Sequence, residues 1–216
     1  MRFILAAMLL GIASAAAGAG NVSAGRDLFA VCAGCHAFDG RGNRNIRAPG
    51  LAGLEPWYVV RQLEHFRSGI RGTSERDPYG MQMASMALAL SDQRAAEDVA
   101  AYIAQLPAPR RDATVRGDSA RGRDRYSACS ACHGAQAEGS QDLGAPQLAG
   151  LDDWYIVAQL ELFKTGLRGA HPDDAYGQQM RAFASLLDDQ QALLDVAAYI
   201  GTLGDRGDAR RAGSRR

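Results

Sequence analysis

A single interval of 97 residues aligns one half of this chain with the other, and this duplication limits the folds open to it. Cys129 follows Cys32 by 97 residues, Trp154 follows Trp57 by the same interval, and no gap is needed over residues 25–106 of the first copy. Two copies are too few for a solenoid, in which at least three repeats share a continuous core. Each copy of about 85 residues must bury a core of its own, and a domain of that size is marginal without a further stabilising group.

The N-terminus has the features of a secretory signal peptide. A basic start, an apolar run and a stretch of alanine and glycine follow one another in residues 1–19, which is the order of a cleaved signal. The apolar run is shorter than the ~18 residues that a membrane-spanning helix needs, so a membrane anchor is the weaker alternative. We expect cleavage, a mature chain that begins near Gly20, and a periplasmic location.

The repeats also indicate where the domains begin and end. We expect one domain over residues 20–108, a second over residues 121–204, and a linker at 109–120 beside prolines that stop the preceding helix. The last segment, residues 205–216, holds five arginines and no large apolar side chain. We therefore expect it to form a disordered basic tail.

Helical periodicity dominates each copy. Apolar residues at i, i+3, i+4 and i+7 predict a helix over residues 99–106 and another over residues 196–203. Asp92 and Asp188 precede these segments as start signals. Residues 57–66 and 154–163 predict a second amphipathic helix in each domain, and residues 27–31 a short first one. No segment alternates between apolar and polar residues for long enough to predict a strand, so the expected fold class is all-α.

The motif Cys-x-x-Cys-His is the most specific chemical signal in the chain. It occurs once in each copy, as Cys32, Cys35 and His36 and as Cys129, Cys132 and His133. Its most specific interpretation is covalent attachment of a c-type haem: two cysteines on one helical turn would form thioethers with the vinyl groups, and the histidine would face the iron. A redox dithiol normally lies near a βαβ pattern, which is missing here. One zinc ion held by all four cysteines would leave the repeated histidines without a role.

A second axial ligand would come from further along the chain, and a methionine thioether is usual where the potential is raised. The duplication selects Met83 and Met180, which lie 97 residues apart, whereas Met81 and Met86 have no methionine counterpart. His171 is the competing ligand in the second copy, but its counterpart is a serine. A role for His171 would make the two haems unlike.

Other repeated residues could contact the haem histidines or the haem itself. Pro49 and Pro146 each lie 13 residues after the haem histidine, where a carbonyl could accept the second ring N–H of that histidine; a plain turn proline is the alternative. The candidate partners of haem propionates are Trp57, Tyr58, Arg71 and Tyr79, with their counterparts 97 residues later. The alternatives are core packing for the aromatic residues and a surface position for the arginine.

Taken together, these residues resemble a known family. Each copy is similar to a class I cytochrome c, with Cys-x-x-Cys-His early, then a proline-bearing Gly-rich stretch, a methionine and a closing helix with Val-Ala-Ala-Tyr-Ile. The tandem arrangement over residues 22–204 resembles the dihaem cytochrome c4 family. The resemblance implies two all-α lobes related by a pseudo-twofold axis and two covalently bound haem c groups. It assigns Cys32, Cys35, His36 and Met83 to one haem, and Cys129, Cys132, His133 and Met180 to the other.

The expected function is periplasmic electron transfer between redox proteins, without catalytic residues. The resemblance implies a terminal oxidase or a quinol- or substrate-oxidising complex as partner. Three alternatives stay open: an electron-accepting subunit of a dehydrogenase or oxidase complex, a peripheral association with the membrane, and a dihaem peroxidase-like enzyme with one five-coordinate iron. The equal numbers of basic and acidic residues, 24 of each, argue against nucleic acid as a partner. Six basic and eleven acidic residues make the second domain net acidic, which suggests a basic partner or merely a solvated surface.

Overall fold

The computed structural model describes residues 20–213, and the surroundings of side chains for residues 20–204. The expected signal peptide, residues 1–19, lies outside the described residues. The first lobe contains α1 (Val22–His36), the 3₁₀ turn η1 (Arg44–Ile46), α2 (Pro56–Arg67), α3 (Pro78–Ala87) and α4 (Gln93–Ile103). The second lobe contains α5 (Ser119–Tyr126), α6 (Ser130–His133), α7 (Asp153–Lys164), α8 (Ala175–Ala184) and α9 (Gln190–Gly213).

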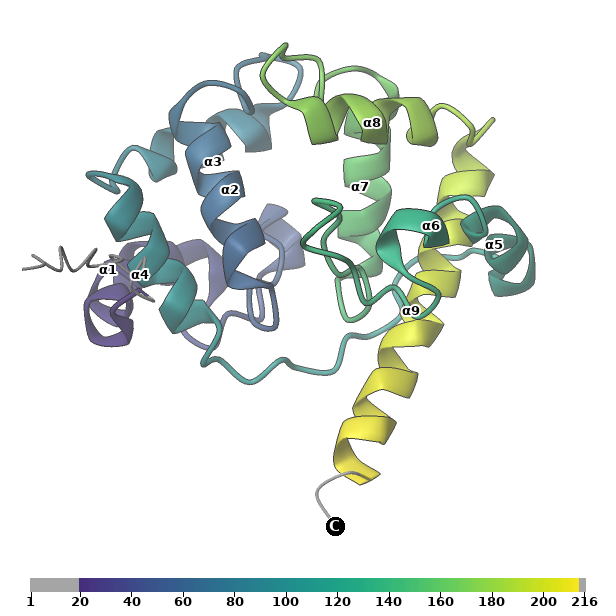
Figure 1. The fold of residues 1–216 in the computed structure, drawn as a ribbon, viewed down its shortest axis with the longest axis horizontal. Coiled ribbons are helices and arrows are strands. Elements are labelled where there is room, and N and C mark those ends of the chain that lie inside the picture. Colours follow the sequence, from purple (N-terminus) through teal and green to yellow (C-terminus); the bar gives the residue numbers. More distant parts are fainter. Residues whose placement is uncertain (1–19, 214–216) are drawn as a thin grey trace, which may run out of the picture.

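The all-α prediction is confirmed. Between residues 20 and 213 extended pairing is limited to one isolated bridge per lobe, Asn43 with Ala48 and Ser140 with Ala145. The two lobes stand side by side and repeat the same arrangement of helices, joined by an extended connection below them (Figure 1). No helix of the described residues is long and apolar enough to cross a membrane.

The helices differ from the expected ones in instructive ways. In the first lobe α1 is longer than predicted and carries the whole Cys-x-x-Cys-His motif, whereas its counterpart is divided into α5 and α6. Helices α3 and α8 were not predicted, because their apolar residues do not follow a clear helical period. The start of α9 is one residue later than expected: Asp189, not Asp188, accepts from the N–H of Ala192 at 2.8 Å. Helix α9 also continues to Gly213, into the segment for which the sequence led us to expect a disordered tail; no proline interrupts it.

The core of each lobe is the crossing of its first and last helices. In each lobe a buried aspartate on the last helix holds the start of the first helix. Asp98 Oδ1 accepts from Asn21 N at 2.6 Å in the first lobe, and Asp195 Oδ1 accepts from Asp118 N at 2.8 Å in the second. Around the two crossings pack Phe29, Val99 and Ile103 in the first lobe and Leu193, Val196 and Ile200 in the second. This crossing fixes the end of α1, or of α5 and α6, from which the cysteines and histidine project.

A symmetric ring of hydrogen bonds joins the lobes. Gln62 Oε1 on α2 accepts from Arg71 Nη1 at 2.7 Å and from Arg168 Nη2 at 2.9 Å. Gln159 Oε1 on α7 accepts from Arg168 Nη1 and from Arg71 Nη2, both at 2.7 Å. Both arginines are buried. Since each glutamine and each arginine lies 97 residues from its counterpart, the ring obeys the pseudo-twofold symmetry and fixes the faces of α2 and α7 against each other.

Candidate functional site

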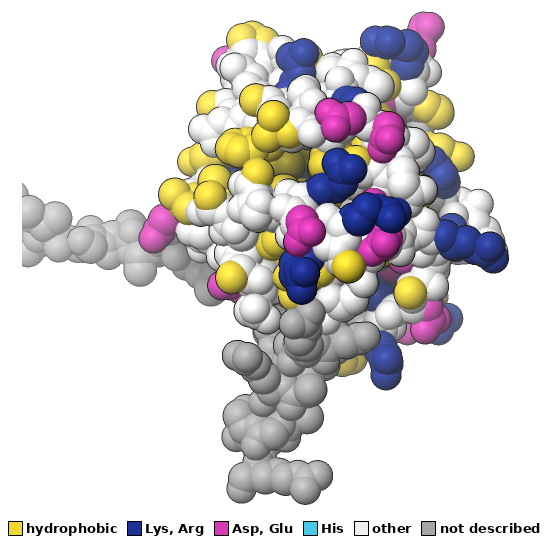
Figure 2. All heavy atoms as spheres, turned by 90° about the vertical axis from the view of Figure 1, so that its right-hand side faces the viewer, with side chains coloured by type: hydrophobic (Ala, Val, Ile, Leu, Met, Phe, Trp, Pro, Cys, Tyr) yellow, Lys and Arg dark blue, Asp and Glu magenta, His cyan; other side chains and the backbone are white. Residues whose placement is uncertain are grey.

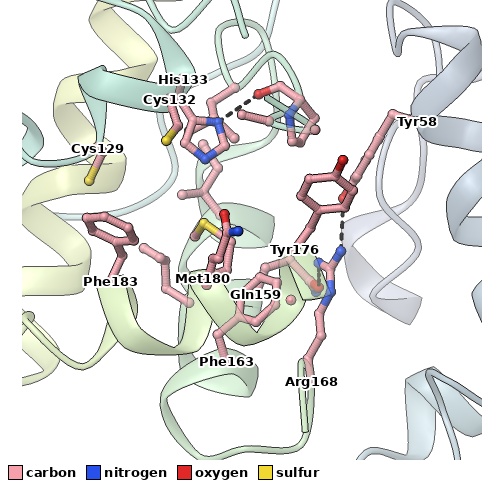
Figure 3. Close-up of a pocket in the computed structure, with 18 of the residues that line it drawn as sticks. Tyr58, Cys129, Cys132, His133, Gln159, Phe163, Arg168, Tyr176, Met180 and Phe183 are labelled. Atoms are coloured by element: carbon pink, nitrogen blue, oxygen red, sulfur yellow. Dashed lines mark hydrogen bonds between the residues drawn. The ribbon is translucent and has the colours of Figure 1, made fainter. Parts of the chain in front are cut away.

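The second lobe contains a largely apolar cavity into which its motif residues point. The lining includes Cys129, Cys132, His133 and Met180, all four of the residues predicted to hold a haem there. The imidazole and the thioether lie on different elements, α6 and α8, and both point into the cavity (Figure 3).

The first lobe repeats this cavity with a larger volume of about 560 Å³. Its lining includes Cys32, Cys35, His36 and Met83, again all four predicted residues. Helix α1 supplies the two cysteines and the histidine, and α3 supplies the methionine. Two segments that are about 50 residues apart in the sequence therefore line one apolar space, as the duplication predicted.

Each histidine is fixed by a proline carbonyl. His36 Nδ1 lies 2.7 Å from Pro49 O, and His133 Nδ1 lies 2.8 Å from Pro146 O. Because a carbonyl oxygen only accepts, Nδ1 must carry a proton, and in the neutral ring Nε2 then presents a lone pair. Burial lowers the pKa of both histidines, so the neutral ring that can bind a metal is favoured.

The four cysteines are unbridged and lie in two separate cavities. Burial raises the pKa of the Cys32 and Cys129 thiols, which keeps these two protonated at neutral pH. Among the described residues no three His, Cys, Asp or Glu side chains gather into a metal site. The arrangement therefore does not match the alternative of one zinc ion shared by the two lobes.

The competing ligands are placed less favourably. His171 is not part of the cavity lining, and its Nδ1 accepts from Asp173 N at 3.2 Å. Met81 also lies outside the first cavity, while Met86 lines it and is 38% exposed. Phe183, its counterpart in the second lobe, lines the other cavity and is 40% exposed. The pairing of Met86 with Phe183 at the interval of 97 residues favours core packing for both. Both instead form the rim of their cavities.

Each cavity also takes part of its wall from the opposite lobe, which sequence reasoning missed. Tyr58 and Arg61 of the first lobe line the second cavity, and Trp154 and Tyr155 of the second lobe line the first. A repeat identifies equivalent residues but not neighbours, so no signal in the sequence could have revealed this exchange.

Two buried donors provide a test of whether a haem fits the first lobe. Trp57 Nε1 and Arg71 Nε have no hydrogen-bond partner among the described residues, although buried polar groups are nearly always paired. Arg71 lines the first cavity. Trp57 lines neither cavity. A group that brings a carboxylate into the first cavity would satisfy Arg71 Nε, and the propionates of a haem are carboxylates. The thiols, the imidazole and the apolar walls fit the rest of that group.

Comparison with known proteins identifies the family. The protein-family model described as Cytochrome c matches the chain twice, at residues 22–107 and 119–204. The cytochrome c4 of Azotobacter vinelandii is 30% identical to the chain over 89% of it and 94% of the relative. The chain belongs to the cytochrome c family, as a dihaem cytochrome of the c4 type. It carries electrons, and it has two covalently bound haem c groups, one on each cysteine pair.

Other similar proteins agree with this family assignment. The thiosulfate dehydrogenase electron acceptor of Stutzerimonas stutzeri is 34% identical over 79% of each chain. The crystal structure of cytochrome c4 from Pseudomonas stutzeri superimposes with a TM-score of 0.67 at 27% identity, covering 85% of this chain and 98% of that one. The thiosulfate dehydrogenase of Marichromatium purpuratum reaches a TM-score of 0.68 at 32% identity, covering 84% of this chain but 40% of that one.

Proposed function

We propose that this c4-type cytochrome carries single electrons in the periplasm, with each iron bound by one histidine and one methionine. His36 and Met83 would hold the iron of the first lobe, and His133 and Met180 that of the second. The observation that carries this proposal is the placement of an imidazole with a free Nε2 and a thioether in the same apolar cavity, twice over. When bound, a haem with both axial positions filled changes valence without making or breaking bonds to substrate.

The residues of the chain would set the redox properties of that group. A thioether ligand and an apolar surrounding both favour the ferrous state, so both potentials should be positive. Arg71 lines one cavity and Arg168 the other, and both would be near enough to neutralise propionate charge. No catalytic residue is required by this function, and a peroxidase-like activity would need one open axial position.

The rims of the cavities suit brief docking of redox partners. Partly exposed apolar side chains surround them, including Tyr79 and Met86 in the first lobe and Tyr176 and Phe183 in the second. On the side of the second lobe seen in Figure 2, basic and acidic side chains are interspersed rather than gathered into one charged patch. Docking that depends on apolar rims is therefore expected to weaken only modestly with salt.

For the partner, we propose an enzyme of the thiosulfate dehydrogenase type as electron donor. Among the similar proteins, two are named as the electron acceptor of thiosulfate dehydrogenase, and one is the enzyme, part of which shares its fold with this chain. For the electron acceptor, the candidate is a terminal oxidase. A cbb3-type cytochrome c oxidase subunit of Sinorhizobium medicae is 30% identical over 69% of this chain and 53% of that subunit. A role as a bound subunit of either complex is the second candidate.

The ligation is tested on the purified holoprotein. Pyridine haemochrome quantitation is expected to give two c-type haems per chain, and a redox titration followed by optical and EPR spectra two low-spin, one-electron centres. A high-spin centre in the wild type would contradict His/Met ligation in that lobe and would favour the peroxidase-like alternative.

The partner is tested with the oxidised holoprotein, a purified thiosulfate dehydrogenase and thiosulfate. Rapid reduction of the haems that requires both enzyme and substrate is expected. If the enzyme reduces another acceptor but leaves this protein oxidised, the proposed donor is wrong. The mass of the mature protein from the periplasmic fraction tests export, with cleavage near Gly20 as the expected result.

A further inference from the structure

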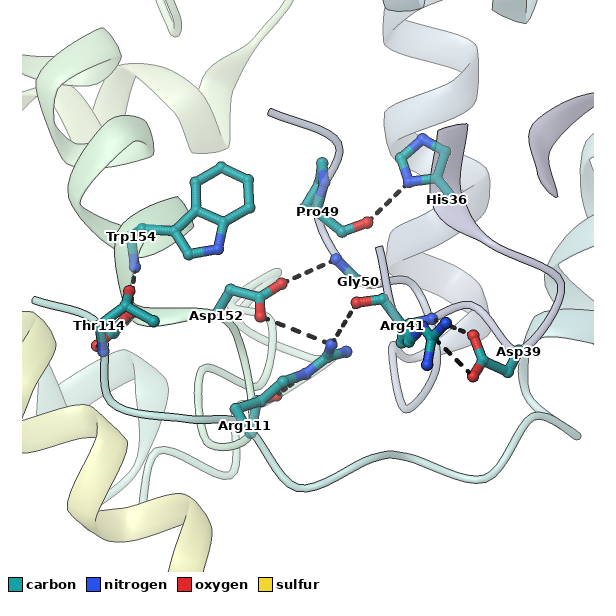
Figure 4. Close-up of polar contacts among 11 residues, drawn as sticks. His36, Asp39, Arg41, Pro49, Gly50, Arg111, Thr114, Asp152 and Trp154 are labelled. Carbon is teal, nitrogen blue, oxygen red and sulfur yellow. Dashed lines mark hydrogen bonds and ion pairs between the residues drawn. The ribbon is translucent and has the colours of Figure 1, made fainter. Parts of the chain in front are cut away.

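The peptide group between Pro49 and Gly50 has both of its polar atoms engaged, one toward each lobe (Figure 4). Its carbonyl oxygen, that of Pro49, lies 2.7 Å from His36 Nδ1. Its N–H, that of Gly50, donates to Asp152 Oδ2 at 2.9 Å. Asp152 belongs to the second lobe, so one peptide group connects a carboxylate of that lobe to the haem histidine of the first.

The second lobe contains the same connection in the opposite direction. Pro146 O lies 2.8 Å from His133 Nδ1, and the N–H of the next residue, Gln147, donates to Glu55 Oε2 at 2.8 Å. Glu55 belongs to the first lobe and lies 97 residues before Asp152. The duplication therefore preserves the contact across the interface, although glutamate has replaced aspartate and glutamine has replaced glycine.

Both carboxylates belong to N-cap residues, where a side chain normally accepts a hydrogen bond from its own helix. Glu55 is the N-cap residue of α2 and Asp152 that of α7, but neither side chain accepts a hydrogen bond from its helix. An aspartate at the N-cap ordinarily accepts from the second or third helical N–H. Here both acceptors are directed to the opposite lobe instead.

Hydrogen bonds in a chain polarise one another. A carboxylate that accepts from the peptide N–H increases the negative charge on the carbonyl oxygen of that peptide. The oxygen then accepts more strongly from histidine Nδ1–H, which makes the imidazole a more basic metal ligand. A more basic ligand favours ferric iron and lowers the reduction potential.

We propose that Asp152 and Glu55 are positioning residues that each lower the reduction potential of the haem in the opposite lobe, acting through the Pro49–Gly50 and Pro146–Gln147 peptide groups. The proposal rests on the proposed ligation by His36 and His133. Under this proposal, the potential of each haem depends on a carboxylate of the other lobe through hydrogen bonds. This dependence is separate from any effect of the distance between the haems.

Arg111, in the segment between the lobes, influences one of the two connections. Arg111 Nη1 lies 3.6 Å from Asp152 Oδ1 and donates to Arg41 O at 2.7 Å. Its positive charge offsets part of the charge of Asp152. Removing it by Arg111→Ala should strengthen the polarisation and lower the potential of the haem in the first lobe.

The test uses the holoprotein with Asp152→Asn and Glu55→Gln, which keep an acceptor oxygen but remove the charge. Asp152→Asn is expected to raise the potential of the haem in the first lobe, and Glu55→Gln that in the second, each leaving the other haem nearly unchanged. A tenfold change in the ratio of reduced to oxidised haem, about 59 mV for one electron, is the upper limit that we expect. EPR g values of the affected haem should shift with its potential, because they report the strength of the axial ligand.

Glu161→Gln is the matched control. Glu161 also belongs to the second lobe and lines the first cavity, but its carboxylate accepts from Gln190 Nε2 at 2.7 Å rather than from the Pro49–Gly50 peptide. If Asp152→Asn shifts the first haem no more than Glu161→Gln does, or shifts both haems equally, charge acts through space and the proposal is wrong. A wild-type spectrum without low-spin haem would instead overturn the proposed ligation, so the two failures are distinguishable.

Discussion

At the scale of single residues, the proposed ligands Met83 and Met180 would determine whether each iron is closed to outside ligands. Both line their cavities together with the motif histidine, and the two cavities differ at the rim, where Met86 stands in one and Phe183 in the other. The second lobe therefore offers one thioether and the first lobe offers two. This difference makes the second lobe the cleaner place to test methionine ligation.

We predict that Met180→Ala converts the haem of the second lobe from low spin to high spin and lowers its potential, because loss of the thioether opens the iron and removes a ligand that favours the ferrous state. EPR of the oxidised protein should lose about half of its low-spin intensity, since one of two haems changes. Met86→Ala is the control and should leave both haems low spin. A fully low-spin Met180→Ala protein would show that another residue is the ligand.

A second prediction concerns Asp195, whose side chain is fully buried. The hydrogen bond from the Arg121 guanidinium at 2.8 Å holds the pKa of this carboxyl well below its usual range. A carboxyl whose folded pKa is depressed contributes stability above its unfolded pKa of about 3.9, and the contribution is lost as the pH falls through the folded value.

We therefore predict that Asp195→Asn lowers the free energy of unfolding at pH 7, by about 2 kcal/mol, and makes the stability of the second lobe less dependent on pH below 4. Urea unfolding at several pH values measures both effects. Asp39→Asn, at an exposed position, serves as the control. An unchanged slope of stability against pH in Asp195→Asn would show that this carboxylate does not contribute to acid sensitivity.

Much of the site could be predicted from residues because the duplication acts as an internal comparison. The interval of 97 residues selected Met83, rather than Met81 or Met86, as the candidate ligand. It also identified the carbonyls of Pro49 and Pro146 as acceptors for the histidine N–H. The contact between Gly50 and Asp152 could not be predicted in this way. Equivalence within a repeat does not specify which residues lie across the interface, and that depends on the docking of the two lobes.

At the scale of elements, the two helix crossings depend on glycine. A Cβ added at Gly25 would overlap the carbonyl oxygen of Asp98, and one at Gly122 that of Asp195. The helices can approach so closely only where no side chain intervenes. Both glycines are visible in the sequence at the interval of 97 residues. The sequence alone does not show why they are needed, since glycine within a helix ordinarily destabilises that helix.

We predict that Gly122→Ala destabilises the second lobe by about 1–3 kcal/mol, because the added methyl group forces α5 and α9 apart. Gly201→Ala on α9 is the matched control: nothing lies within 4 Å of its added Cβ, so the better helix propensity of alanine should stabilise the lobe by about 0.5–1 kcal/mol. Thermal or urea unfolding of the holoproteins compares the two. Opposite signs are expected, and equal destabilisation would contradict the close crossing.

At the scale of the whole molecule, two buried guanidinium groups lie between the lobes. Arg71 and Arg168 are 7% and 8% exposed and donate to the same two glutamine oxygens. Two buried like charges are costly unless they are well hydrogen-bonded and neutralised. Amide oxygens accept from the Nη groups but leave Arg71 Nε without a partner among the described residues. Haem propionates would supply an acceptor and the negative charge. The docking of the lobes and the loading of the haems should therefore depend on one another.

The double variant Gln62→Ala/Gln159→Ala tests this dependence, because it removes both acceptors of the ring and leaves each guanidinium without its amide oxygens. Each lost hydrogen bond to a charged group should cost about 1.5–3 kcal/mol. We predict that the lobes then unfold in two separated calorimetric transitions, whereas the wild-type lobes unfold together. Gln136→Ala, an exposed position outside the interface, should behave as the wild type. A single transition at the wild-type temperature in the double variant would mean that the apolar surfaces of α2 and α7 suffice to hold the lobes together.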